Sequence, residues 1–338
     1  MTIQPPANRP REISVTEAIE PAIERVKLML FRPFIFSKWI IIGFCAWLAG
    51  LGESGGGGGF NGFNNFNNHG NRPQPAEQFR QFYNHAHEFV LANLDWIVPV
   101  AVFGTILIVA IGLAVLWLNS RGKFMFLHCV ALDKAEVDIP WRTYAAQGNS
   151  LFWFRLVVCF AGLALCLPLL IFLAATIIQM VLQGGPNVAA VMLAVGLGLG
   201  LILVGIPFAL VRKLTADFVV PIMYLRGRTC TTAWGELWTL LSANPGSFVV
   251  YILFQIVLTI VIGVIVMAAV LVTCCIALCF LALPFVGTVL LLPILIFKRS
   301  YSLLYLAQFG PEYDVFPQPA APPAPPEAPI SPLGPIPT

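Results

Sequence analysis

Long uncharged apolar runs alternate with shorter polar connections along this chain. Residues 96–120, 156–211 and 248–297 carry no charged side chain. A membrane-spanning helix needs about 20 mostly apolar residues, so the first run fits one span and the other two fit two spans each. The sequence QGGPN at 183–187 is typical of a turn, and a second turn is expected near residues 273–275.

An additional apolar run at residues 34–51 is the weakest of the expected spans. Its uncharged core, residues 39–52, is short, so a crossing has to include Lys38. A lysine near a helix end extends its amine to the headgroups at low cost. The sequence therefore predicts six spans, at about 34–51, 96–120, 156–182, 188–211, 248–272 and 276–297.

The distribution of basic residues predicts the orientation. With six spans, seventeen of the nineteen Lys and Arg residues fall on one side, and Arg72 and Arg80 fall on the other. Lys and Arg are retained on the cytoplasmic side during insertion. We therefore expect an all-α polytopic membrane bundle of six transmembrane helices with both termini in the cytoplasm. The polar residues that precede the first span contain no cleavable signal peptide, so that span is expected to be an uncleaved anchor.

Composition supports a membrane protein. The chain is 58% hydrophobic and 10% charged, whereas soluble domains are about 25% charged. The net charge of +3 gives no global field that would recruit nucleic acid. We expect an integral membrane protein whose partners are the lipids of the anionic cytoplasmic leaflet, together with an unidentified membrane or cytoplasmic protein.

A similar amphipathic segment precedes each pair of spans, at residues 14–33, 138–155 and 231–248. Each ends in a helix-breaking sequence: Arg32-Pro33, Gly148-Asn149 or Asn244-Pro245-Gly246. A helix with one apolar and one charged face lies in the headgroup plane, so the pattern predicts three repeats of a cytoplasmic interfacial helix followed by a hairpin. The alternative is that amphipathic loops coincide with breaks by chance.

The remaining segments flank or interrupt a membrane domain expected at residues 14–315. Residues 1–13 are a disordered arm. The Gly/Asn-rich external loop at 52–75 is either a flexible linker or a weakly adhesive segment. The Pro-rich cytoplasmic tail at 316–338 is either a spacer or a docking peptide. A further interfacial helix is expected at residues 76–96; His85 and His87 there point to different helix faces, so no metal site is expected.

No catalytic motif or cofactor site is evident. The predicted spans contain no GxSxG, HExxH or P-loop sequence. The cysteines fit small buried hydrophobes, or a bridge among Cys274, Cys275 and Cys279. Gly196 and Gly200 form a GxxxG pair that favours close helix packing. The candidate lipid-headgroup or structural ion contacts are Arg25, Lys27, Arg32, Lys38, Arg155, Arg212, Lys213 and Asp217, with Arg212 or Lys213 as the nearest partner for Asp217.

The stretches RGKFMFLHCV (121–130), PWRTYAAQGNSLFWFR (140–155) and DFVVPIMYLRG (217–227) resemble a group of uncharacterised bacterial multi-span membrane proteins. That group is similar to the membrane domain fused to some glycerophosphodiester phosphodiesterases. The resemblance covers residues 14–315 and implies an inner-membrane protein. It transfers no activity, because the phosphodiesterase catalytic domain is missing from this sequence.

These observations favour a non-enzymatic module that organises lipids or partner proteins through its basic cytoplasmic side. A transporter or lipid-handling protein is the alternative, and it would need a polar cavity at mid-membrane. An intramembrane enzyme would need converging acid, base or nucleophilic side chains, and the spans do not supply them.

Overall fold

The computed structural model describes residues 13–52, 81, 84–85, 88–183, 187–273, 280–281 and 283–316. Every regular element in these ranges is helical, so the prediction of an all-α fold is confirmed. The arm at 1–12, most of the Gly/Asn-rich loop and the tail at 317–338 lie outside the described residues, as do Cys274, Cys275 and Cys279.

Within these described ranges, four helices are long and apolar enough to cross a membrane. They are α4 (Leu94–Leu132), α6 (Ala145–Leu182), α7 (Val188–Leu214) and α10 (Pro245–Val272). At 1.5 Å per residue α4 is about 58 Å long, well beyond the roughly 30 Å of a hydrocarbon core. None of the most apolar part of α4, α6 or α7 is buried against protein, as expected of helices that meet lipid.

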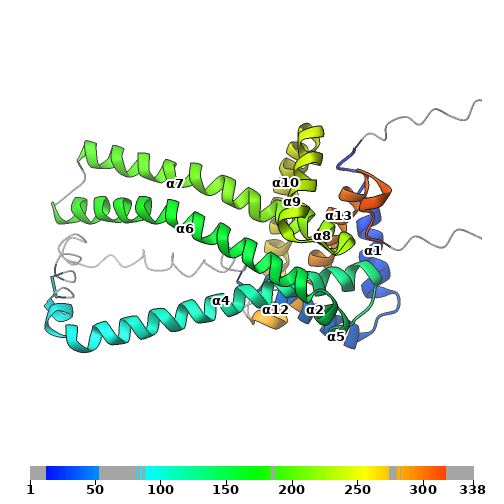
Figure 1. Cartoon of the computed structure of the whole chain (residues 1–338), viewed down its shortest axis with the longest axis horizontal. Helices are drawn as coiled ribbons and strands as arrows, with labels where there is room; N and C mark the ends of the chain where they lie inside the picture. Colours follow the sequence, from blue (N-terminus) through cyan, green and yellow to red (C-terminus); the bar gives the residue numbers. More distant parts are fainter. Residues whose placement is uncertain are drawn as a thin grey trace, which may run out of the picture.

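The other ends of these helices pack into a common core, here called the hub. The hub contains α1 (Ile19–Phe31), α2 (Phe36–Gly50), the last turns of α4, the start of α10 and α13 (Leu292–Ala307). It also contains the π-helix η3 (Thr215–Val219) and α8 (Val220–Arg226), which continue α7 without a break. Figure 1 shows α4, α6 and α7 projecting from one side of the hub, whereas α10 leaves it in a different direction.

Aromatic side chains hold the centre of the hub together. Tyr251 lies between Phe218 and Tyr305, with ring centroids 4.8 and 4.7 Å away. All three side chains are fully buried. These rings come from α10, η3 and α13, so the cluster fixes the base of α10 against the end of α7.

The six-span prediction is not confirmed, because the first and last expected spans form shorter helices. α2 has 15 residues, about 22 Å, and lies beside the hub half of α4. A Cβ at Gly122 would be 2.7 Å from the backbone nitrogen of Ala49, which shows how closely the two helices approach. The expected span at 276–297 contains instead α12 (Pro284–Leu290) and the start of α13, which meet at Leu291. Both helices begin with proline in the first turn, the position where its missing N–H costs least.

The short helices before the longer segments are present, but one expected break is wrong. α1 ends before Arg32-Pro33, and α9 (Cys230–Ala243) ends at Asn244. After α5 (Asp138–Thr143) the break is at Tyr144, and α6 runs straight through Gly148-Asn149. The reason is tertiary: a Cβ at Gly148 would be 2.9 Å from the Arg121 side chain, so the glycine permits helix packing there.

The chain after α13 folds back over the hub. The short helix η4 (Pro311–Tyr313) follows α13, and the Phe309 ring stacks on Phe248 at 5.2 Å. Phe316, expected to begin the Pro-rich tail, contacts the Arg25 guanidinium. Both ends of the described chain therefore lie on the hub side of the long helices.

Candidate functional site: a basic cavity in the hub

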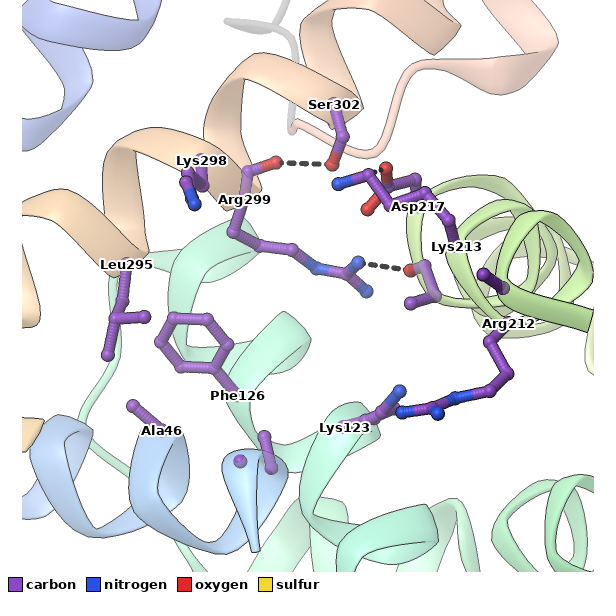
Figure 2. Close-up of a pocket in the computed structure, with 14 residues that line it drawn as sticks. Ala46, Lys123, Phe126, Arg212, Lys213, Asp217, Leu295, Lys298, Arg299 and Ser302 are labelled. Atoms are coloured by element: carbon purple, nitrogen blue, oxygen red, sulfur yellow. Dashed lines mark hydrogen bonds and ion pairs between the residues drawn. The ribbon is translucent and has the colours of Figure 1, made fainter. Parts of the chain in front are cut away.

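A cavity of about 510 Å³ opens between α2, α4, α7, η3 and α13. Its walls include the apolar side chains of Ala46, Phe126 and Leu295 (Figure 2). Its charged lining consists of five cations and one acid: Lys123, Arg212, Lys213, Lys298, Arg299 and Asp217. We call this space the basic cavity.

Three helices bring the cations together. Arg212 and Lys213 occupy the last turn of α7, which continues directly into η3. Lys123 lies on α4, three residues after the end of the uncharged run 96–120. Lys298 and Arg299 follow directly after the uncharged run 248–297. All five therefore lie just past the end of an apolar segment, where a membrane surface would meet the hub.

The π-helix shapes one wall of the cavity. A π-turn is wider than an α-turn and is frequent at functional sites. Here the Ala216 carbonyl accepts a hydrogen bond from Arg299 of α13 at 2.6 Å. Figure 2 shows the Arg299 side chain crossing from α13 toward η3, so this contact ties the two walls together.

Asp217 belongs to a polar network at the edge of the cavity. Of its two expected partners, Lys213 lies against it, with Nζ 2.8 Å from Oδ2. The buried Tyr251 hydroxyl donates to the same carboxylate at 2.9 Å. Gln255 donates to the Tyr251 hydroxyl at 3.0 Å, and Lys213 donates to the Gln255 amide oxygen at 3.4 Å. The carboxylate is therefore held by α7 and α10 together.

The cavity carries an excess of positive charge. Five cations face one carboxylate, which leaves four positive charges in excess among the residues that line it. Burial lowers the pKa of Lys298, and the neighbouring Lys213 lowers it further, whereas Asp217 raises it. Lys298 lies beyond the apolar run 248–297, and Lys123 is only 9% exposed. An anion in this space would offset both the burial and the mutual repulsion of the cations.

Arg25 and Lys38 contact the end of α4. Arg25 donates to the carbonyl oxygens of Val130 and Ala131 at 3.1 and 2.7 Å, which are among the last carbonyls of α4. Lys38 pairs with Asp133, the residue after α4, at 2.9 Å. Positive charge at a helix C-terminus is stabilising, so these two side chains fasten α1 and α2 to the end of α4.

Arg155 also joins two helices. It donates to the Asn119 side chain and, at 3.4 Å, to the Ser120 hydroxyl. Asn119 in turn donates to the Leu51 carbonyl at 2.7 Å, which ends α2. Of the other candidates, Lys27 and Arg32 are exposed on the outside of the hub.

The expected close packing at Gly196 and Gly200 is absent. A Cβ at either position would meet no atom within 4 Å, because no other described part of the chain lies against that face of α7. Between α6 and α7, Gly162 of α6 faces the neighbouring helix, and its added Cβ would be 3.5 Å from the Phe208 ring of α7.

Three cavity residues were not among the sequence candidates: Lys123, Lys298 and Arg299. The sequence counted them only as basic residues on one side of the membrane. Their position just after apolar runs was a usable signal, because cations at the ends of spans lie at headgroup depth. Their convergence depends on how α4 and α13 pack, which the sequence pattern does not show.

The geometry supports anion binding more than metal chemistry. Within the described ranges, no three metal-ligating side chains come together. The cavity offers guanidinium and ammonium donors, which bind carboxylates and phosphates through charge-assisted hydrogen bonds.

Fold and site together define an all-helical membrane protein with a basic cavity at the base of its long helices. The chain belongs to a family of unknown function, DUF7544, whose model matches residues 13–292. No curated protein and no solved structure matches it. The match gives no link to glycerophosphodiester phosphodiesterases, so that resemblance stays a prediction.

Proposed function

We propose that this protein is a non-enzymatic inner-membrane protein that binds the headgroup of an anionic lipid in the basic cavity. The observation that carries the proposal is the convergence of five cations from α4, α7 and α13 around one cavity. Basic pockets between transmembrane helices on the cytoplasmic side bind anionic headgroups in other membrane proteins. The apolar wall of Ala46, Phe126 and Leu295 suits the glycerol and upper acyl region of a lipid.

The level of the cavity relative to the long helices supports a lipid ligand. Asn119, Ser120 and Arg155 mark the point where α4 and α6 become polar, and Arg212 marks it on α7. The apolar parts beyond these residues are each about 25 residues long, enough to cross a bilayer with some tilt. The cavity then lies at headgroup depth. A transporter would need a cavity at mid-membrane, and no observation favours one.

We propose that the hub faces the cytoplasm, because Lys and Arg residues are retained there. Both ends of the described chain lie on the hub side, so both termini are cytoplasmic in this proposal. α2 ends beside Asn119, at the hub end of α4, whereas Leu94 lies at the far end.

Reporter fusions test this orientation. A reporter at the N-terminus and one inserted at residue 70 should read from opposite sides of the membrane. Reporters that read from the same compartment would contradict the orientation.

Lipid retention tests the binding function. The full-length protein, extracted in mild detergent from membranes that contain phosphatidylglycerol and phosphatidylcholine, should retain phosphatidylglycerol preferentially. Each cation near an anionic surface contributes about 1 kcal/mol, roughly five-fold in affinity. The variant Arg212→Gln with Lys298→Gln should therefore lose most of the preference.

The matched control replaces two exposed basic residues outside the cavity, Lys27→Gln with Arg228→Gln. It removes the same charge and should keep the preference. Equal loss in both double variants would show that net charge alone attracts the lipid, and equal retention of both lipids by the wild type would remove the proposal.

A further inference from the structure

The cations approach the basic cavity from three sides. Figure 2 shows Lys123 entering from α4, Arg212 from the end of α7 and Arg299 from α13. Asp217, the acid among the described residues that line the cavity, is already held by Lys213 and Tyr251. An incoming anion would therefore meet donors distributed around it rather than on a single wall.

This arrangement distinguishes between two kinds of phosphate group. A phosphodiester has two non-bridging oxygens and one negative charge, and its two substituents occupy the other corners of the tetrahedron. A phosphomonoester presents three terminal oxygens and carries about −1.5 to −2 charges at pH 7. Three free corners match donors on three sides, and the larger charge matches the excess of four positive charges in the lining.

We propose that the basic cavity selects a phosphomonoester group over a phosphodiester. The inference rests on the proposed function and names the ligand class of the same site. The shared chemistry occurs in a lipid whose headgroup is a bare phosphate and in a soluble phosphomonoester. Burial and the neighbouring Lys213 lower the pKa of Lys298, whereas Asp217 raises it, which agrees with the presence of several cations in the lining of the cavity.

Native mass spectrometry of the full-length protein tests the selection. Phosphatidic acid, phosphatidylglycerol and phosphatidylcholine with identical acyl chains are added to the protein at equal concentration. We expect phosphatidic acid to bind at least ten-fold more tightly than phosphatidylglycerol, and phosphatidylglycerol more tightly than phosphatidylcholine. Equal binding of the two anionic lipids, both above phosphatidylcholine, would overturn the inference and leave the proposed function standing. Equal binding of all three lipids would overturn both.

A competition arm separates the two sources of the phosphate. Glycerol 3-phosphate that displaces phosphatidic acid at millimolar concentration would assign the site to a soluble phosphomonoester. Retention of the lipid against it would assign the site to the lipid headgroup.

Variants test whether the cavity is responsible. Arg212→Gln should reduce the preference for phosphatidic acid from ten-fold to below three-fold, and Arg212→Lys should keep part of it because the charge remains. Lys298→Gln gives a second reading from a different helix, and the exposed Arg228→Gln is the control. A preference that stays ten-fold in both Arg212→Gln and Lys298→Gln would overturn the inference.

Discussion

Replacing Asp217 should affect stability and anion binding in opposite directions. Asp217→Asn keeps the shape of the side chain and an oxygen that can accept the Tyr251 hydroxyl, but it removes the ion pair with Lys213. The pair is partly exposed, with side-chain accessibilities of 42% for Lys213 and 14% for Asp217. Such pairs contribute about 1 kcal/mol or less, so Asp217→Asn should lower the free energy of unfolding by about that amount.

Asp217→Ala should cost more, because it also removes the acceptor of a buried hydroxyl. Tyr251 is fully buried, and leaving a buried donor without a partner costs about 1–3 kcal/mol. The alanine variant should therefore be less stable than the asparagine variant by about that difference. A double-mutant cycle with Tyr251→Phe should show a coupling of about 1–2 kcal/mol, since the two side chains share one hydrogen bond.

Equilibrium unfolding by titration of SDS into mixed micelles, followed by tryptophan fluorescence, measures these differences. The same Asp217→Asn protein should bind phosphatidic acid more tightly, because the one acid that lines the cavity is neutralised. About 1 kcal/mol, or roughly five-fold, is expected. Equal stability of the asparagine and alanine variants would refute the role of the Tyr251 hydrogen bond. Weaker phosphatidic acid binding by the asparagine variant would refute the electrostatic description of the cavity.

Three further predictions concern the hub. Gly122→Ala should destabilise the protein by about 1–3 kcal/mol, because the added Cβ would be 2.7 Å from α2 backbone atoms. Gly196→Ala should not, because no atom lies within 4 Å of its added Cβ. SDS titration compares the two variants, and equal effects would contradict the packing. Arg25→Gln should lower the free energy of unfolding by about 1–3 kcal/mol, because it removes two hydrogen bonds to α4 carbonyls. Replacing the exposed Lys27 in Lys27→Gln should change it by no more than about 0.5 kcal/mol. Similar losses in both variants would show that charge matters rather than hydrogen bonding. Burial lowers the pKa of His128 from 6.5, so the unfolded chain binds the proton more tightly, and stability that is present above that pH is lost as the pH falls. The Tm of the protein should therefore drop between about pH 7.5 and pH 5, and it should drop less in His128→Gln. An unchanged pH profile in that variant would contradict the assignment.

The fold class and the ends of several helices could be predicted from the sequence, because they depend on local composition. A charge-free run of about 25 residues that crosses a bilayer has to satisfy its backbone hydrogen bonds internally, so it is expected to form a helix. Proline and glycine breaks also mark the ends of α1, α9 and α10 correctly. Gly148-Asn149 failed as a break, because the same glycine can end a helix or let two helices approach. Only the position of Arg121 beside it distinguishes the two cases.

The candidate site was predicted in part. Arg212, Lys213 and Asp217 were identified because a charge beside an apolar run needs a partner. Arg25 and Arg155 were identified as lipid-headgroup or structural ion contacts, and both bond to α4. The sequence shows that a cation lies at the end of a span. Whether it faces lipid, a helix end or a cavity depends on which helices pack around it, and those contacts join residues far apart in the chain.

The π-helix at Thr215–Val219 makes this segment unusual in the change of length that it can absorb. A π-turn corresponds to one residue more than an α-turn accommodates. Deleting a single residue there would restore regular α geometry and leave the residues after it facing nearly the same way, so Ile222 and Met223, now buried in the hub, would stay buried. The same deletion in the α-helical turns before or after it would turn everything that follows by about 100°. Natural variation should therefore tolerate the loss of one residue within Thr215–Val219 better than in the helices on either side.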